Sequence, residues 1–121
     1  MPIVCRNKTT TINKGELAIS LRLGQFNKGV YLLEMDGVKL NLALSKKVIL
    51  TKHNNAPGVL LILLSALASR NINIKDLRLG ELNDIGYSAI AVNGDSNEIR
   101  NLLTKLGDQY YEANLIEFHS F

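Results

Sequence analysis

The sequence predicts an α+β protein, and two kinds of apolar pattern lead to that prediction. Apolar residues alternate with other residues along much of 17–44, which is the period of strands with one buried face. Two later segments have helical signals instead: 59–69 is strongly apolar, and 96–106 carries its apolar residues at helical spacing. Since 46% of the 121 residues are hydrophobic, the chain can build a core, mostly from aliphatic side chains because it lacks tryptophan.

The first 45 residues predict a β-rich N-terminal segment. The expected strands of this β-meander are 17–23, 30–35 and 38–44. Residues 24–29 are expected to form a turn region, and Asp36-Gly37 indicates a hairpin because both residues tolerate the positive φ of a tight turn. The polar segment 1–13 gives no prediction. Because so small a sheet is marginal alone, we expect it to pack on the rest of the chain.

Residues 46–121 predict a second domain with the element order β-α-β-β-α-β. The expected strands are 48–51, 72–82, 87–92 and 110–118, and the expected helices are 59–69 and 96–106. Pro57 suits the first turn of the first helix, and Asn71 suits its left-handed end. Asp95 is expected to cap the second helix, which Gly107 ends. This order is that of the ferredoxin-like arrangement, with both helices on one face of an antiparallel sheet.

Composition and motif content argue against several classes of function. Residues 1–45 carry six basic and three acidic side chains, scattered rather than gathered into a nucleic-acid patch. The single cysteine, Cys5, allows no disulfide within the chain, which suits the cytoplasm. The longest apolar run, 59–64, is far too short for a membrane span, and no signal peptide follows Met1. We therefore expect a cytoplasmic protein with no membrane or nucleic-acid partner.

Catalytic and metal chemistry also lack their usual signals. His53 and His119 lie 66 positions apart, without the cysteine or carboxylate spacing of a metal site. There is no glycine-rich phosphate loop and no serine in a nucleophile-elbow context. We expect no enzymatic activity, no metal and no cofactor.

One loop resembles a known family. The string His53-Asn54-Asn55-Ala56-Pro57-Gly58-Val59 resembles the first loop of an ACT domain, whose pattern is H-x-N/D-x-P-G-hydrophobic. Fifteen residues after Gly58, Asn73 lies within Ile72-Asn73-Ile74, which is similar to the opening of the family's second strand. The resemblance covers about 76 residues, 46–121. It implies a regulatory module that binds an amino acid and performs no chemistry itself.

Two further residue strings narrow the resemblance to two groups of enzymes. Glu34-Met35-Asp36-Gly37 and Leu77-Arg78-Leu79-Gly80 are similar to the C-terminal region of long D-3-phosphoglycerate dehydrogenases and of iron–sulfur L-serine dehydratases. This implies L-serine as the ligand, control of a serine-pathway enzyme, and a preceding allosteric β domain to which 1–45 would belong. The chain departs from the long dehydrogenases at Asn55 and Ala56, where they have Asp and Arg; Asn55 is nearer the short, serine-inhibited forms.

Five residues form the candidate ligand site. They are His53, Asn55, Gly58, Val59 and Asn73. A glycine at a helix N-terminus exposes backbone N–H groups where the helix dipole favours a carboxylate, and the two asparagines each offer a donor and an acceptor. By resemblance, His53 and Asn55 act from one chain and Asn73 from its neighbour. The structural alternatives are that His53 ends a strand, Asn55 closes an Asx-turn and Asn73 satisfies a backbone group.

The sequence also predicts a homodimer or higher homo-oligomer. Residues 59–64 are apolar all round the helix, so one apolar face of the helix stays uncovered after the other face packs on its own sheet. Leu61 and Leu64 should cover a second surface, either the matching helix of another subunit or the N-terminal strands. A catalytic domain or subunit is a further expected partner. The alternative function is a protein-interaction or transcription-regulator subunit with a vestigial ligand site.

Overall fold

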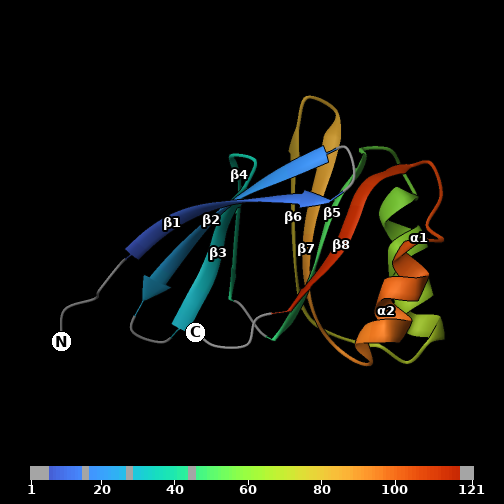
Figure 1. Ribbon diagram of the computed structural model, residues 1–121. Helices are drawn as coiled ribbons and strands as arrows, with labels where there is room; N and C mark the ends of the chain where they lie inside the picture. Colours follow the sequence, from blue (N-terminus) through green and yellow to red (C-terminus); the bar gives the residue numbers. More distant parts are fainter. Residues whose placement is uncertain (1–5, 15–16, 27–28, 44–45, 118–121) are drawn as a thin grey trace.

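The computed structural model describes residues 6–14, 17–26, 29–43 and 46–117, which form two antiparallel sheets and two helices (Figure 1). The first sheet has the order β1-β2-β3-β4, and its strands are β1 (Arg6–Lys14), β2 (Leu17–Phe26), β3 (Gly29–Met35) and β4 (Val38–Ala43). The second has the order β6-β7-β5-β8, and its strands are β5 (Lys47–Asn54), β6 (Asn73–Leu82), β7 (Ile85–Asn93) and β8 (Tyr110–Glu117). The helices are α1 (Val59–Ser69) and α2 (Ser96–Leu103).

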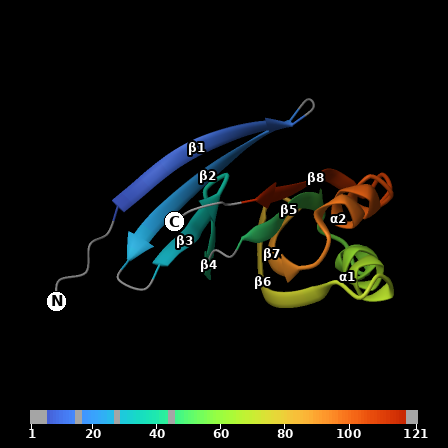
Figure 2. The same ribbon diagram turned by 60° about the horizontal axis from the view of Figure 1, so that its bottom comes forward.

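The elements lie in three layers. Both helices cover one face of the second sheet, and the first sheet lies on the opposite side (Figures 1 and 2). The predicted α+β class is therefore confirmed, and the strand order of the second sheet is compatible with a ferredoxin-like arrangement. Within the described residues, no helix has the length and apolar character needed to cross a membrane.

Two apolar clusters hold the layers together. The cluster between the sheets consists of Leu32, Met35, Val38, Leu40, Leu42, Val48, Leu50, Tyr87, Ala89 and Ala91. The cluster between the second sheet and the helices consists of Ile49, Leu63, Leu67, Ile72, Ile90, Val92, Ile99, Leu102, Leu103, Leu106 and Leu115. Since both faces of β5 and β7 are covered, their central residues are continuously buried, unlike those of a strand with one wet face.

Gly80 explains how β4 can lie against β6. A Cβ atom at Gly80 would lie 2.3 Å from Cγ1 of Val38 and 3.7 Å from the carbonyl oxygen of Lys39. Those distances leave no room for a side chain, so the absence of one at this position lets the two strands approach closely. Gly80 thus belongs to the contact between the sheets.

Several local predictions are confirmed. Helix α1 has its predicted bounds, and Asn71 follows it with a φ of 56°. The β3–β4 turn has positive φ at Asp36 (52°) and Gly37 (82°), as a primed turn requires. The Asp95 carboxylate accepts a hydrogen bond of 2.9 Å from the backbone N–H of Glu98, so it caps α2.

Other predictions are wrong in their bounds. Strand β5 continues to Asn54, so His53 and Asn54 belong to a strand and not to the loop, because their partners on β7 and β8 extend the ladder. Strand β2 runs through Gly24, where a turn was expected. Helix α2 ends at Leu103 and turns lead from it to Gly107. Residues 6–13, which lie in the polar segment that gave no prediction, form β1 together with Lys14, and β1 pairs along the whole of its length with β2.

The expected strand ends at 44 and 118, Cys5 and His119 lie outside the described residues.

The exposed face of α1 also requires a correction. The first sheet packs on the helix-free face of the second sheet, so it does not cover α1 as one alternative required. Leu64 is half-buried against the helix-side core, whereas Leu61 is 63% exposed and Ile62 41% exposed. The exposed apolar pair of the helix is therefore Leu61 with Ile62.

Candidate functional site

A tight turn leads into α1 and leaves its N-terminus open. The backbone N–H of Val59 donates to the carbonyl oxygen of Ala56 at 3.3 Å, and Gly58 has φ 85° and ψ −14°. Pro57 and Gly58 therefore occupy the central positions of a type II turn, so Pro57 lies before the helix and not in its first turn. No side chain caps the helix, its first turn holds no acidic residue, and a Cβ at Gly58 would meet nothing within 4 Å.

His53 lies under this turn, on the face of the sheet that the helices cover. His53 follows Ile49 of the helix-side core by four positions on β5, and alternate residues of a strand share a face. The side chain is only 6% exposed. Its ring centroid lies 5.3 Å from that of Tyr110, whose hydroxyl donates to the carbonyl oxygen of Val59 at 2.7 Å. Tyr110 therefore connects the imidazole to the first turn of α1.

One nitrogen of the imidazole has a partner and the other has none. His53 Nδ1 lies 3.1 Å from the carbonyl oxygen of Asn54, which can only accept, so Nδ1 carries the hydrogen. Among the described residues, Nε2 is a buried side-chain atom without any hydrogen-bond partner. In the neutral ring, Nε2 is then a buried acceptor on the face of the sheet that the helices cover. Such an unsatisfied buried group requires an explanation, and a bound ligand would supply one.

Asn55 lies in a loop that is fixed from two sides. Its backbone N–H donates to the carbonyl oxygen of Asp84 at 3.1 Å, and its side-chain Nδ2 donates to the Glu81 carboxylate. On the other side, Asn54 donates to Gln109 through its backbone N–H at 2.8 Å and through Nδ2 at 2.7 Å. These hydrogen bonds give the loop a defined position relative to the β6–β7 turn and to β8.

The site includes three residues that the sequence analysis missed. Strand pairing aligns Glu81, Gly86, His53 and Tyr110 in one row across β6, β7, β5 and β8. A Cβ at Gly86 would lie 2.3 Å from Cε1 of His53, so the imidazole occupies the space above this glycine. The residues Asn83-Asp84, both with positive φ, form the β6–β7 turn, and recognising them as a hairpin would have paired Glu81 with Gly86.

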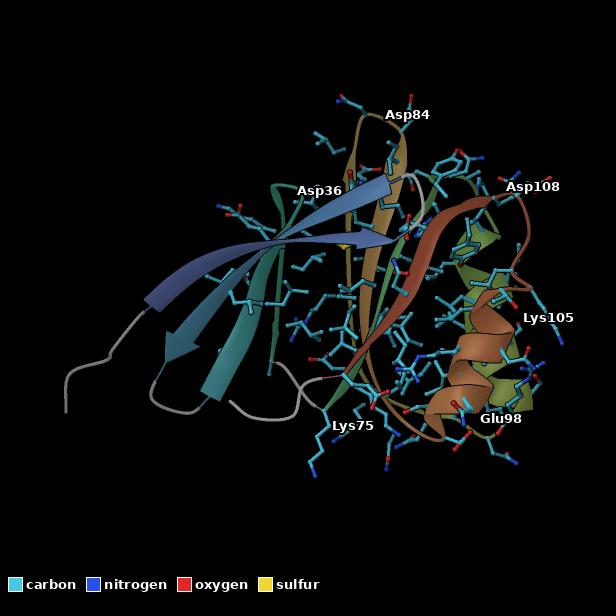
Figure 3. The ribbon with its side chains drawn as sticks, in the orientation of Figure 1. Asp36, Lys75, Asp84, Glu98, Lys105 and Asp108 are labelled. Atoms are coloured by element: carbon cyan, nitrogen blue, oxygen red, sulfur yellow. The ribbon has the colours of Figure 1, made fainter. Side chains whose placement is uncertain are left out.

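Asn73 is not brought to the other four residues within one chain. It opens β6 and pairs with Asn93, whereas Glu81 lies eight residues further along, about 25 Å away at the rise of a strand. Figure 3 shows the two ends: Asp84 lies at the same end of the sheet as Asp108, and Lys75 lies at the other. Asn73 is exposed on an edge strand, so a second chain can reach it.

Burial governs the ionisation of two tyrosines, Tyr110 on the helix-covered face of the second sheet and Tyr87 on the other face. Burial raises the pKa of Tyr110 to about 12, against a smaller lowering by a hydrogen bond with the Leu63 backbone. On the opposite face of the sheet, burial also raises the pKa of Tyr87, where Lys52 opposes the rise and Asp36 adds to it. Lys52 forms an ion pair with Asp36 there, so its charge faces the first sheet.

Among the residues that the structure describes, no three His, Cys, Asp or Glu side chains are gathered as metal ligands. A separate pocket of about 240 Å³ lies between α2 and β8, lined by Arg100, Leu103, Thr104, Ala113, Asn114 and Leu115, and it includes none of the candidate residues.

Comparison of the chain with models of known protein families gives no match, and neither does comparison with curated proteins.

Proposed function

We propose that the chain is a regulatory module of the ACT type that binds a small amino acid, with L-serine as the leading candidate. It would control a serine-pathway enzyme such as D-3-phosphoglycerate dehydrogenase, act in the cytoplasm and perform no catalysis. The observation that carries the proposal is the buried, unpartnered Nε2 of His53, whose ring contacts Tyr110, which in turn is hydrogen-bonded to the first turn of the uncapped helix α1. The compatible strand order and the open space at Gly58 support it.

The chemistry of the turn suits an α-carboxylate. The first N–H groups of a helix have no partner within the helix, and the dipole adds partial positive charge there. Val59 opens α1, and Gly58 lets a ligand approach closely. The N–H of Val59 already donates to Ala56, so in the proposed complex the carboxylate meets the N–H groups that follow it in the first turn. His53 Nε2 accepts a hydrogen from the ammonium or hydroxyl group of the ligand.

A two-fold dimer would complete the site. Strand β6 is the edge of its sheet, and it carries an exposed apolar surface of Ile74 (37% exposed) and Leu79 (53%). Pairing of two β6 strands antiparallel would cover this surface and satisfy the strand edge. It would also bring Asn73 of the partner subunit to the end of β6 at which the His53 loop lies.

A second candidate is a protein-interaction or transcription-regulator subunit with a vestigial ligand site. The same exposed apolar side chains favour it, because such patches are typical of binding surfaces. The two candidates differ in whether any amino acid binds.

Asn73→Ala tests the proposed site. Loss of one partner of a ligand hydrogen bond costs about 1–3 kcal/mol, so calorimetric titration should give an affinity for L-serine that is roughly 5- to 150-fold weaker. Thermal unfolding should be unchanged because the side chain is exposed. Asn97→Ala, an equally exposed position on α2, is the control and should bind L-serine as the wild type does. Equal affinities in the two variants would show that Asn73 is structural.

A further inference from the structure

The charges around the His53 loop differ from those of a simple anion site. Residues 53–59 contain no Lys or Arg, and the neighbouring β6–β7 hairpin contributes the carboxylates of Glu81 and Asp84. A bare anion at the N-terminus of α1 would be attracted by the helix and repelled by these carboxylates. A zwitterion would instead use both signs of charge.

We propose that Glu81 binds the α-ammonium group of the ligand and makes the site select amino acids over plain carboxylic acids. This inference rests on the proposed function, and it assigns the amine to a residue outside the ACT-like motif. Glu81 lies in the same row as His53, with only Gly86, which has no side chain, between them. Its carboxylate therefore shares the helix-covered face with the unpartnered Nε2.

Asn55 holds the Glu81 carboxylate at the loop. Asn55 Nδ2 donates to Oε2 of Glu81, while the Asn55 backbone N–H is tied to Asp84. A carboxylate has about four acceptor positions, so one hydrogen bond from Asn55 leaves others for an ammonium group. The carboxylate is thus oriented in advance, which reduces the loss of side-chain freedom on binding.

The test compares amino acids with analogues that lack only the amine. Wild-type chain and Glu81→Gln are titrated calorimetrically with L-serine and L-alanine, and with 3-hydroxypropionate and propionate. Hydrogen bonds to charged groups are worth roughly tenfold to a hundredfold in affinity, so Glu81→Gln should weaken the two amino acids by about that factor. The two analogues should bind the variant at least as well as the wild type, because one repelling charge is gone.

Two controls keep the result interpretable. Glutamine retains an oxygen that can accept from Asn55, so the loop and the thermal unfolding midpoint should persist. Glu98→Gln removes a charge at the far end of the domain (Figure 3) and should leave every affinity unchanged.

The outcomes separate the inference from the function on which it rests. Wild type that binds L-serine or L-alanine, together with a Glu81→Gln variant that binds it equally well, would overturn the role of Glu81 and leave the proposed function intact. Wild type that binds neither amino acid nor any other of the twenty would overturn both.

Discussion

The position of the His53 side chain depends on a residue of a neighbouring strand. The imidazole fits only because Gly86 has no side chain, and the hydrogen bond at Nδ1 leaves Nε2 as the ring nitrogen without a partner among the described residues. Its orientation therefore depends on a glycine 33 positions later in the sequence.

Gly86→Ala should displace the imidazole and destabilise the protein by about 1–3 kcal/mol, as overpacking of a filled site does. His53→Ala makes room for the new methyl group, so the double variant should be less destabilised than the sum of the two single changes. Urea unfolding of all four proteins measures this coupling. Additive changes would mean that the ring and the glycine do not share this space.

The raised pKa of Tyr110 leads to a prediction for the stability of the protein at alkaline pH. Its pKa is about 12 in the folded state and near 10 when unfolded, since burial disfavours the phenolate. The folded state then holds the proton more tightly, so the stabilisation is complete below pH 10 and is lost as pH rises towards 12. In urea unfolding from pH 9 to 12, Tyr110→Phe should lose stability less steeply than wild type. An identical slope would contradict the assignment.

At the scale of elements, the exposed surface of α1 is the feature that bears most directly on association between chains. The helix contacts the edge strand β6 and buries Val59, Leu63 and Leu67, while Leu61 and Ile62 are exposed. Charges at these two positions should therefore affect association more than folding.

Leu61→Glu with Ile62→Glu should convert a wild-type dimer into a folded monomer and weaken L-serine binding at the same time. Sedimentation at tens of micromolar measures the first effect and calorimetry the second. Asn101→Glu on the exposed side of α2 is the control and should remain dimeric. Wild type that is itself a folded monomer would exclude the dimer and leave the surface open to a different partner.

Local sequence signals predicted most helices and strands well, but they did not predict how these elements pack together. Helix α1 and the Asp36-Gly37 turn follow from apolar content and from tolerance of positive φ, both of which act within a few residues. Strand β1 could not be predicted from its polar sequence, because pairing with β2 supplies its stability. The candidate loop was found by motif, but Glu81, Gly86 and Tyr110 join it through strand register, which is non-local.

At the scale of the whole molecule, the two sheets share one apolar cluster. Val48, Leu50 and Tyr87 of the second sheet are buried against the first. The proposed division at residue 45 therefore separates segments that should depend on each other for stability. Gly80 is a point of close approach within this contact.

Gly80→Ala should destabilise the whole chain by about 1–3 kcal/mol, because its methyl group would collide with Val38. Val38→Ala should relieve the collision in the double variant. If the sheets unfold together, hydrogen exchange will report one loss of protection for β4 and β5 alike. Loss of protection in β4 alone would indicate that the first sheet is an independent, loosely attached unit.

The proposed regulatory role requires that the His53 turn binds an amino acid. Calorimetric titration of the wild-type chain with the twenty amino acids tests this most directly. We predict saturable binding of L-serine, or of a close small amino acid, tighter than that of any bulky one and at two ligands per dimer. No heat with any amino acid at millimolar concentration would contradict it.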